Sequence, residues 1–190
     1  MTYKIQNLPI HSIESAPAKA KPILEDAKKM LGFVPNMYGA MANEPALLTA
    51  YINSYNAFRA QSGFSPIEQE VIFLVVSREN ACAYCVAAHS VVADMMSNVP
   101  APITDAIRDG RPIADTKLET LARFTSAMVL SRGNPTESDV AAFKKAGYSE
   151  KAILSLILAI SVKTLSNFAN HVFHTPIDTA FAGRTWTTVA

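Results

Sequence analysis

Two cysteines three residues apart, followed by a histidine four residues later, are the side chains best suited to chemistry in this chain. They stand in the segment CAYCVAAH, residues 82–89. In an α-helix, residues three or four apart share a face, so both sulfurs and the imidazole would lie in one row. The start of a helix favours thiolate over thiol, and an imidazole one turn along can accept a thiol proton. The spacing therefore predicts a redox-active pair able to attack peroxide.

The two thiols are expected to have unequal roles. A place at the helix start favours Cys82 as the nucleophile, and proximity to His89 favours Cys85. The helix-end effect is worth about 0.3–1 kcal/mol at exposed sites. A positioned general base contributes roughly 100–10,000-fold in rate. Cys85 is therefore the predicted nucleophile, and Cys82 would resolve its sulfenic acid to a disulfide.

Cys82 and Cys85 are the two cysteines of the chain, and bridging them would close only a short ring. Such a ring restricts the unfolded chain little, so redox chemistry or metal binding is favoured over a structural bridge. A zinc site of two sulfurs, an imidazole and a carboxylate is one alternative, although three ligands on a single helix are cramped. Two small buried hydrophobes in a non-catalytic helical protein are another alternative.

A fourth candidate residue, Glu70, stands twelve positions before Cys82 in an apolar segment. A helix–turn–helix would fold this carboxylate back toward the thiol pair. There it would orient His89 or pass a proton from Cys82.

Composition limits the class of protein. The 190 residues are 49% hydrophobic and 17% charged, which excludes disorder and suits one domain with a sizeable core. A net charge of +1 offers no electrostatic footprint for nucleic acid or an anionic membrane. No apolar run near Met1 resembles a signal peptide, and the run 153–162 is too short to span a bilayer and is expected to be a buried helix. We therefore expect a soluble, cytoplasmic protein without a membrane or nucleic-acid partner.

Proline, glycine and capping residues divide the chain into helices, and no segment alternates as a strand would. Asn80 is a plausible cap for the helix that carries the cysteines, and Thr136 with Asp139 can cap another from both directions. Tyr51, Tyr55 and Phe58 form a stripe expected in a core or an interface. The expected helices cover residues 22–31, two segments opening near 35 and 45, and 66–78, 81–97, 103–108, 116–131, 136–146 and 149–171. The predicted class is all-α.

One short segment of the sequence is repeated. Gly63-Phe64-Ser65 recurs 84 positions later as Gly147-Tyr148-Ser149, each before an apolar helix. An internally duplicated helical unit and a chance similarity of two buried helices both fit this pattern.

The string of Glu70, eleven residues, CAYC, three residues and His89 resembles the active-site pattern of AhpD-like alkylhydroperoxidases in the carboxymuconolactone decarboxylase family. The flanking segments 77–80 and 86–89 are similar as well. Outer segments at 32–36, 167–171 and 175–178 resemble the peroxidase-related branch. The resemblance covers about residues 32–181, the expected core of one AhpD-like domain spanning 1–190, with the leader and tail peripheral.

The resemblance implies an all-helical bundle that forms a homo-oligomer (dimer, trimer or hexamer) and reduces hydroperoxides. Carried over by position, Cys85 is the peroxidatic thiol, Cys82 the resolving one, and His89 with Glu70 the proton relay. The expected partners are a hydroperoxide and an external thiol or dithiol reductant, in an antioxidant role. No cofactor or metal is required. The end-of-helix His171 and His174 are expected to be helix-end cations or surface imidazoles.

One departure concerns Tyr84, where the AhpD pattern commonly has histidine. Tyrosine can hydrogen-bond a substrate oxygen but is a poor base near neutral pH. It is therefore a weak candidate for lining the substrate site. Its presence leaves open a thiol-disulfide oxidoreductase without efficient peroxidase turnover.

Overall fold

The structure, a computed structural model of the chain, describes residues 2–187. Over that range the chain is helical and contains no β-strand, which confirms the all-α prediction. The elements, in chain order, are α1 (Lys21–Leu31), α2 (Asn36–Met41), α3 (Pro45–Gln61), α4 (Pro66–Glu79), α5 (Ala83–Met95), α6 (Ala101–Asp109), α7 (Thr116–Leu130), α8 (Glu137–Lys145), α9 (Glu150–Phe173) and the 3-10 helix η1 (Thr179–Arg184).

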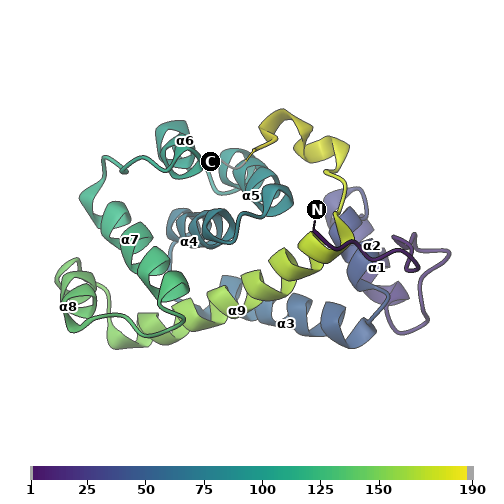
Figure 1. Cartoon of the computed structure of the whole chain (residues 1–190), viewed down its shortest axis with the longest axis horizontal. Helices are drawn as coiled ribbons and strands as arrows, with labels where there is room; N and C mark the ends of the chain where they lie inside the picture. The colour runs from purple at the N-terminus through teal and green to yellow at the C-terminus, as the bar shows by residue number, and fades with distance from the viewer. Residues whose placement is uncertain (1, 188–190) are drawn as a thin grey trace.

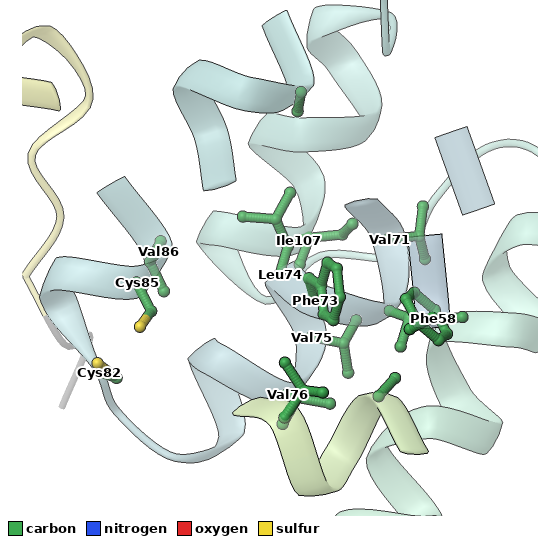
Figure 2. Packing of buried hydrophobic residues seen from close by; sticks show 14 of the residues in the cluster. Phe58, Val71, Phe73, Leu74, Val75, Val76, Cys82, Cys85, Val86 and Ile107 are labelled. Carbon is green, nitrogen blue, oxygen red and sulfur yellow. The ribbon is translucent and has the colours of Figure 1, made fainter. Parts of the chain in front are cut away.

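Helix α4 lies in the middle of the bundle (Figure 1) and packs against α5, α6, α7 and α9. Every residue from Glu68 to Ser77 is buried. Figure 2 shows side chains of α4 gathered with Phe58 of α3 and Ile107 of α6 in the core. A helix with neighbours on several sides has no solvent face, which explains its apolar sequence.

Helix α4 begins where its capping residues predict. Ser65 accepts a hydrogen bond from the Glu68 N–H, the Glu68 carboxylate accepts from the Ser65 N–H, and Pro66 takes the first helical position. The same reciprocal arrangement joins Thr136 and Asp139 at the start of α8, as predicted.

The connection from α4 to α5 differs from the sequence-based prediction. Asn80 ends α4 instead of capping α5, and its side-chain amide donates to Asn167 of α9 at 2.9 Å. Ala81 takes a left-handed conformation (φ 54°), which a helix cannot continue through. The extended Cys82 is then the N-cap, so α5 begins at Ala83, two residues later than expected.

The repeated Gly-aromatic-Ser segments adopt matching local structures. Gly63 and Gly147 both have positive φ, at 78° and 97°, and Ser65 and Ser149 both cap the helix that follows. The similarity stops there, because α4 ends at Glu79 whereas α9 runs unbroken to Phe173. The internal duplication of a helical unit therefore remains a prediction.

Helix α9 is long and apolar enough to cross a membrane by length and composition, with a mean hydropathy of 1.7 over its best window. It lies instead within the bundle, along α3 and against α2, α4 and α5 (Figure 1). Leu156, Ala159 and Val162 are buried, but Leu154 and Ile157 are 67% and 46% exposed. The expectation of a buried helix over 153–162 therefore holds for one face only.

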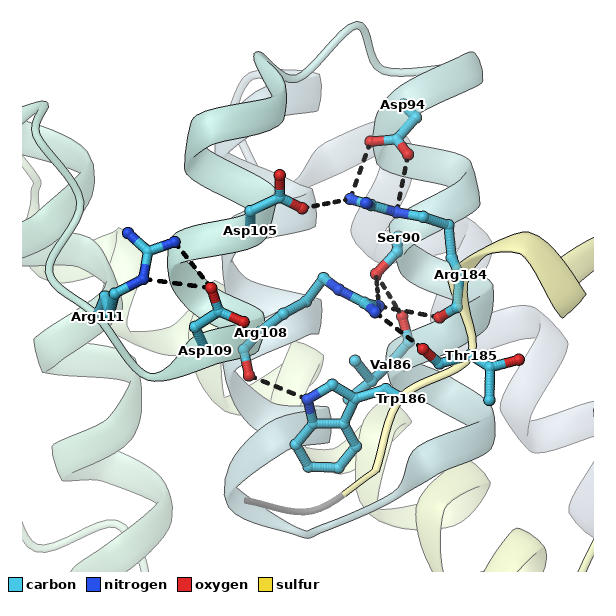
Figure 3. A network of polar contacts seen from close by, with 10 residues as sticks. All are labelled: Val86, Ser90, Asp94, Asp105, Arg108, Asp109, Arg111, Arg184, Thr185 and Trp186. Atoms are coloured by element: carbon cyan, nitrogen blue, oxygen red, sulfur yellow. Dashed lines mark hydrogen bonds and ion pairs between the residues drawn. The ribbon is translucent and has the colours of Figure 1, made fainter.

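The segment after α9 is fastened across α5 and α6 (Figure 3). The Arg108 guanidinium donates to the carbonyl oxygens of Arg184 and Thr185 at 2.9 and 3.0 Å, and the Trp186 indole donates to the Arg108 carbonyl at 2.9 Å. Arg184 pairs with Asp94 and Asp105, each at 3.0 Å. These contacts hold the tail against the helix that carries the cysteines.

Candidate active site

The two thiols lie at the start of α5, where the chain turns in from α4 (Figure 2). Both are reduced and buried, with 1% of Cys82 and 2% of Cys85 exposed. The Cys82 N–H donates to the Ser77 carbonyl at 2.9 Å, which fixes the cap residue to the preceding helix. The Asn170 side-chain amide contacts both sulfurs, at 3.2 Å from Cys85 and 3.9 Å from Cys82, so the two thiols lie beside the same group of α9.

The thiols are electrostatically unequal. The hydrogen bond to Cys85 and burial both raise the pKa of Cys82. Burial alone would raise the pKa of Cys85 too, but the hydrogen bond from Cys82 and the charge of Lys163 outweigh it. The pKa of Cys85 is therefore well below the usual thiol value. Of the pair, Cys85 is the one disposed to be a thiolate.

Glu70 and His89 meet on facing helices, as the sequence predicts. The His89 Nδ1 atom lies 2.8 Å from Oε2 of Glu70, whose side chain is fully buried. The other carboxylate oxygen lies 2.5 Å from an Arg59 nitrogen and 3.4 Å from the Ser97 hydroxyl. Burial raises the pKa of Glu70, but its partners His89 and Arg59 lower it overall. Glu70 is therefore an ionised carboxylate at neutral pH.

Burial and the charge of Lys163 lower the pKa of His89. The imidazole is therefore neutral near pH 7. A carboxylate only accepts hydrogen bonds, so Nδ1 carries the proton and Nε2 the lone pair. This tautomer leaves Nε2 as a base. The ring also packs on Phe73, with 4.8 Å between ring centroids.

The four predicted residues form two pairs, not one row. Within residues 2–187, no hydrogen bond joins His89 to Cys85. Cys82 lies one residue outside the helix, and the His89 ring is directed to Glu70. A protonated His89 would lower the pKa of Cys85, so the two side chains are near enough to interact electrostatically.

The direct partners of Cys85 come from α9, which sequence reasoning missed. The Asn170 side-chain amide lies 3.2 Å from the Cys85 sulfur and 3.9 Å from that of Cys82, and the Ser166 hydroxyl lies 3.8 Å from Cys85. Lys163 stands one turn before Ser166 and is 1% exposed. A signal was available: Lys163, Ser166, Asn167 and Asn170 recur at helical spacing in an otherwise apolar segment.

Tyr84 points away from this chemistry. Its hydroxyl donates to Asp178 and accepts from the Met37 N–H at 3.4 Å, while Asp178 also accepts from the Asn36 N–H at 3.1 Å. Burial and the Asp178 carboxylate raise the pKa of Tyr84. The phenol thereby links the segment after α9 to the start of α2. Its hydroxyl already has two hydrogen-bond partners, Asp178 and the Met37 N–H.

The remaining candidates lie outside this centre. His171 and His174 are exposed at the end of α9, where His174 takes a left-handed conformation (φ 50°) that ends the helix. Among residues 2–187, no three His, Cys, Asp or Glu side chains are grouped to hold a metal ion. Two surface cavities, of ≈ 330 and ≈ 230 Å³, lie near His11 and near Arg78, away from both sulfurs.

Comparison with known proteins shows which solved structures share this fold. A sequence profile of the Carboxymuconolactone decarboxylase family matches residues 45–127, which include Glu70, both cysteines and His89. Two solved structures of peroxidase-related proteins share the fold. That from Ralstonia eutropha JMP134, described as an alkylhydroperoxidase AhpD core, is 20% identical with a TM-score of 0.81, over 98% of this chain and 100% of the other. That from Silicibacter sp. TM1040 is 22% identical with a TM-score of 0.79, over 97% and 98%.

A third structure with this fold is the debrominase Bmp8, solved as a cysteine-to-alanine variant with 2,3,4-tribromopyrrole. It is 18% identical with a TM-score of 0.79, over 96% of this chain and 97% of the other. No curated protein matches the chain. The family profile matches one part of the chain, and the solved structures show that the whole chain has the AhpD-like fold.

Proposed function

We propose that this protein is a thiol-dependent peroxidase of the alkylhydroperoxidase type, with Cys85 as the peroxidatic residue. The observation that carries the proposal is the buried thiol pair beside α9: the Asn170 amide contacts both sulfurs and the Ser166 hydroxyl contacts Cys85, while the pKa of Cys85 is lowered and that of Cys82 is raised. A thiolate is the nucleophile that peroxide reduction needs. Its neutral partner is placed to complete a disulfide.

The chemistry proceeds in two balanced steps. The Cys85 thiolate attacks the distal peroxide oxygen, the O–O bond breaks, and the alkoxide takes a proton and leaves as alcohol. The Cys82 sulfur then displaces hydroxide from the sulfenic acid, releasing water and forming the Cys82–Cys85 disulfide. The thiol has then been oxidised by two electrons and the peroxide reduced by two. An external thiol or dithiol in a reducing compartment, here the cytoplasm, restores the pair by exchange.

Glu70 and His89 would serve as the proton relay. The Nε2 lone pair of the neutral His89 accepts the proton that Cys82 loses on resolution, and Glu70 stabilises the imidazolium that results. Within residues 2–187 no hydrogen bond joins His89 to Cys85, so in this scheme His89 accepts transferred protons and does not form the thiolate.

Peroxide consumption by the purified protein with a dithiol reductant tests the scheme. Cys85→Ser is expected to abolish turnover, and Cys82→Ser to stop after one equivalent, with a sulfenic acid that a dimedone probe traps. Full turnover by Cys85→Ser would refute the assignment. Dithiol–disulfide exchange without peroxide consumption would favour the alternative thiol-disulfide oxidoreductase.

A second candidate is reductive removal of bromide from a halogenated heteroaromatic ring, and the shared fold with Bmp8 favours testing it. The same cysteine pair can supply the two electrons, becoming a disulfide as a proton replaces the released bromide. Bromide release from tribromopyrrole with the reduced protein, faster than peroxide turnover, would select this reaction over the first.

A further inference from the structure

Lys163 is a buried cation at the thiol pair with no acidic partner. It is 1% exposed, and its ammonium lies 5.7 Å from the centre of the Phe73 ring, whose other neighbours include His89. Among residues 2–187, no carboxylate lies within ion-pair distance of it. Lysine is almost never fully buried unless it is paired, so its counter-ion has to be sought among other groups.

Within the described residues, the buried carboxylates near Cys85 already have other partners, and none pairs with Lys163. Glu70 binds Arg59 and His89, and Asp178 accepts hydrogen bonds from the Tyr84 hydroxyl and the Asn36 N–H. His89 is neutral near pH 7, and burial raises the pKa values of Tyr51 and Tyr84, so both phenols are uncharged. Cys82, Tyr84 and His89 of its own segment, Tyr51 of α3 and Lys163 of α9 interact electrostatically with Cys85. Behind them, Glu70 with Arg59 contacts His89, and Asp178 contacts Tyr84.

A Cys85 thiolate would supply the missing negative charge. The same face of α9 that carries Lys163 already contacts this sulfur through Asn170 and Ser166, at 3.2 and 3.8 Å. We infer that Lys163 is the counter-ion of the Cys85 thiolate and the positioning residue that selects Cys85, not Cys82, as the nucleophile. This inference rests on the proposed function, and it assigns formation of the thiolate to α9 instead of to His89.

The pairing also sets the redox balance of the cysteines. When the disulfide forms, the thiolate is lost and Lys163 remains buried without an anion. An interaction present only in the reduced state makes a disulfide more oxidising, since the reduced form is selectively stabilised. Removing the lysine charge should therefore make the reduction potential of the pair more negative.

The decisive measurement is the pH titration of the Cys85 thiolate, followed by its ultraviolet absorbance in a Cys82→Ser background, where Cys85 is the sole cysteine. Adding Lys163→Met should raise the midpoint by about 1–3 pH units, the effect of an opposite charge within a few ångströms. Lys163→Arg should restore most of the shift. Lys151→Met, which removes an exposed lysine of the same helix, is the matched control and should leave the midpoint unchanged.

An unchanged midpoint in Lys163→Met would overturn the inference. If that variant does not fold, a second measurement keeps Lys163 in place and compares Cys85→Ser with Cys82→Ser. Both are buried Cys-to-Ser changes in one turn of the chain. Cys85→Ser should lower the Tm more, by a margin that shrinks as pH falls below the Cys85 midpoint. Equal losses at every pH would also overturn the inference.

These readouts do not depend on peroxide turnover. A low, Lys163-dependent midpoint without peroxide consumption would refute the proposed peroxidase and leave the ion pair standing. Peroxide consumption together with a Cys85 midpoint that does not change in Lys163→Met would support the peroxidase and refute the ion pair.

Discussion

The Nδ1 atom of His89 lies 2.8 Å from Oε2 of Glu70, across the interface between α5 and α4. The helix reversal at residues 80–82 brings the two together, and Arg59 of α3 holds the opposite carboxylate oxygen. The imidazole is thus fixed in one tautomer by a carboxylate that is itself fixed by an arginine. Such a chain orients a base without exposing it to water.

Replacing Glu70 with Gln is expected to reduce peroxide turnover about 10- to 1,000-fold, because the neutral amide no longer stabilises an imidazolium at His89. The change keeps the side-chain shape, so the fold should persist. The measurement is the pH profile of kcat/KM. Glu68→Gln is a control on the same helix, since Glu68 pairs with Lys117 at 2.9 Å, away from the thiols. A Glu70→Gln enzyme with parental turnover would remove this residue from the relay.

A second prediction concerns stability below neutral pH. Burial and Lys163 lower the pKa of His89 below its ordinary value of 6.5, so the unfolded chain binds a proton that the folded chain resists. Stability is therefore full above pH 6.5 and falls as pH decreases toward the folded-state pKa, by at most about 1.4 kcal/mol per pH unit. Urea unfolding of the reduced protein between pH 7.5 and 5.5 measures the slope.

His89→Gln should flatten that slope, whereas the exposed His171→Gln should not change it. A slope that survives His89→Gln would mean that another group titrates. Loss of stability at still lower pH has a separate source, because the lowered pKa of Glu70 protects the fold only until that carboxylate is protonated.

The helices and the Glu70–His89 pair were predictable because they depend on local signals. Caps, prolines and glycines mark most helix ends within two or three residues, and the spacing of Glu70 from the cysteines follows from one helix reversal. The exact start of α5 was not predictable, because it depends on the left-handed Ala81 and on Asn80 bonding to Asn167 from a distant helix. The partners of Cys85 on α9 are likewise separated from it by about eighty residues, and no local pattern pairs the two segments.

The role of Tyr84 can be tested by removing its hydroxyl alone. Tyr84→Phe leaves the buried Asp178 with the Asn36 N–H but without the phenol, at an expected cost of about 1–3 kcal/mol. Because the phenol is directed to Asp178 and the start of α2, peroxide turnover should stay near the parental rate. Urea unfolding measures the loss of stability, and initial-rate kinetics measure the turnover. A drop in turnover of tenfold or more at unchanged stability would instead give Tyr84 a place at the substrate.

The outer face of α9 leads to a prediction about assembly. Leu154, Ile157, Phe168 and Val172 recur at helical spacing and are 67%, 46%, 57% and 39% exposed. Exposed apolar residues on one face of a helix, a stripe here interrupted by Ser161, are typical of an interface, and the family resemblance implies a homo-oligomer. We therefore expect a second copy of the chain to cover this stripe. Sedimentation should show an oligomer for the parent and smaller species for Ile157→Lys and Phe168→Glu.

Leu130→Lys is the matched control, because Leu130 is equally exposed at 67% but ends α7. It should leave the assembly intact. The stripe lies on the same helix as Ser166 and Asn170, so disassembly is also expected to loosen the thiol partners and reduce peroxide turnover. A parent chain that sediments as a monomer, or a Phe168→Glu variant that remains fully assembled, would exclude this face as the interface. In that case the high hydropathy of α9 would be explained by its buried face alone.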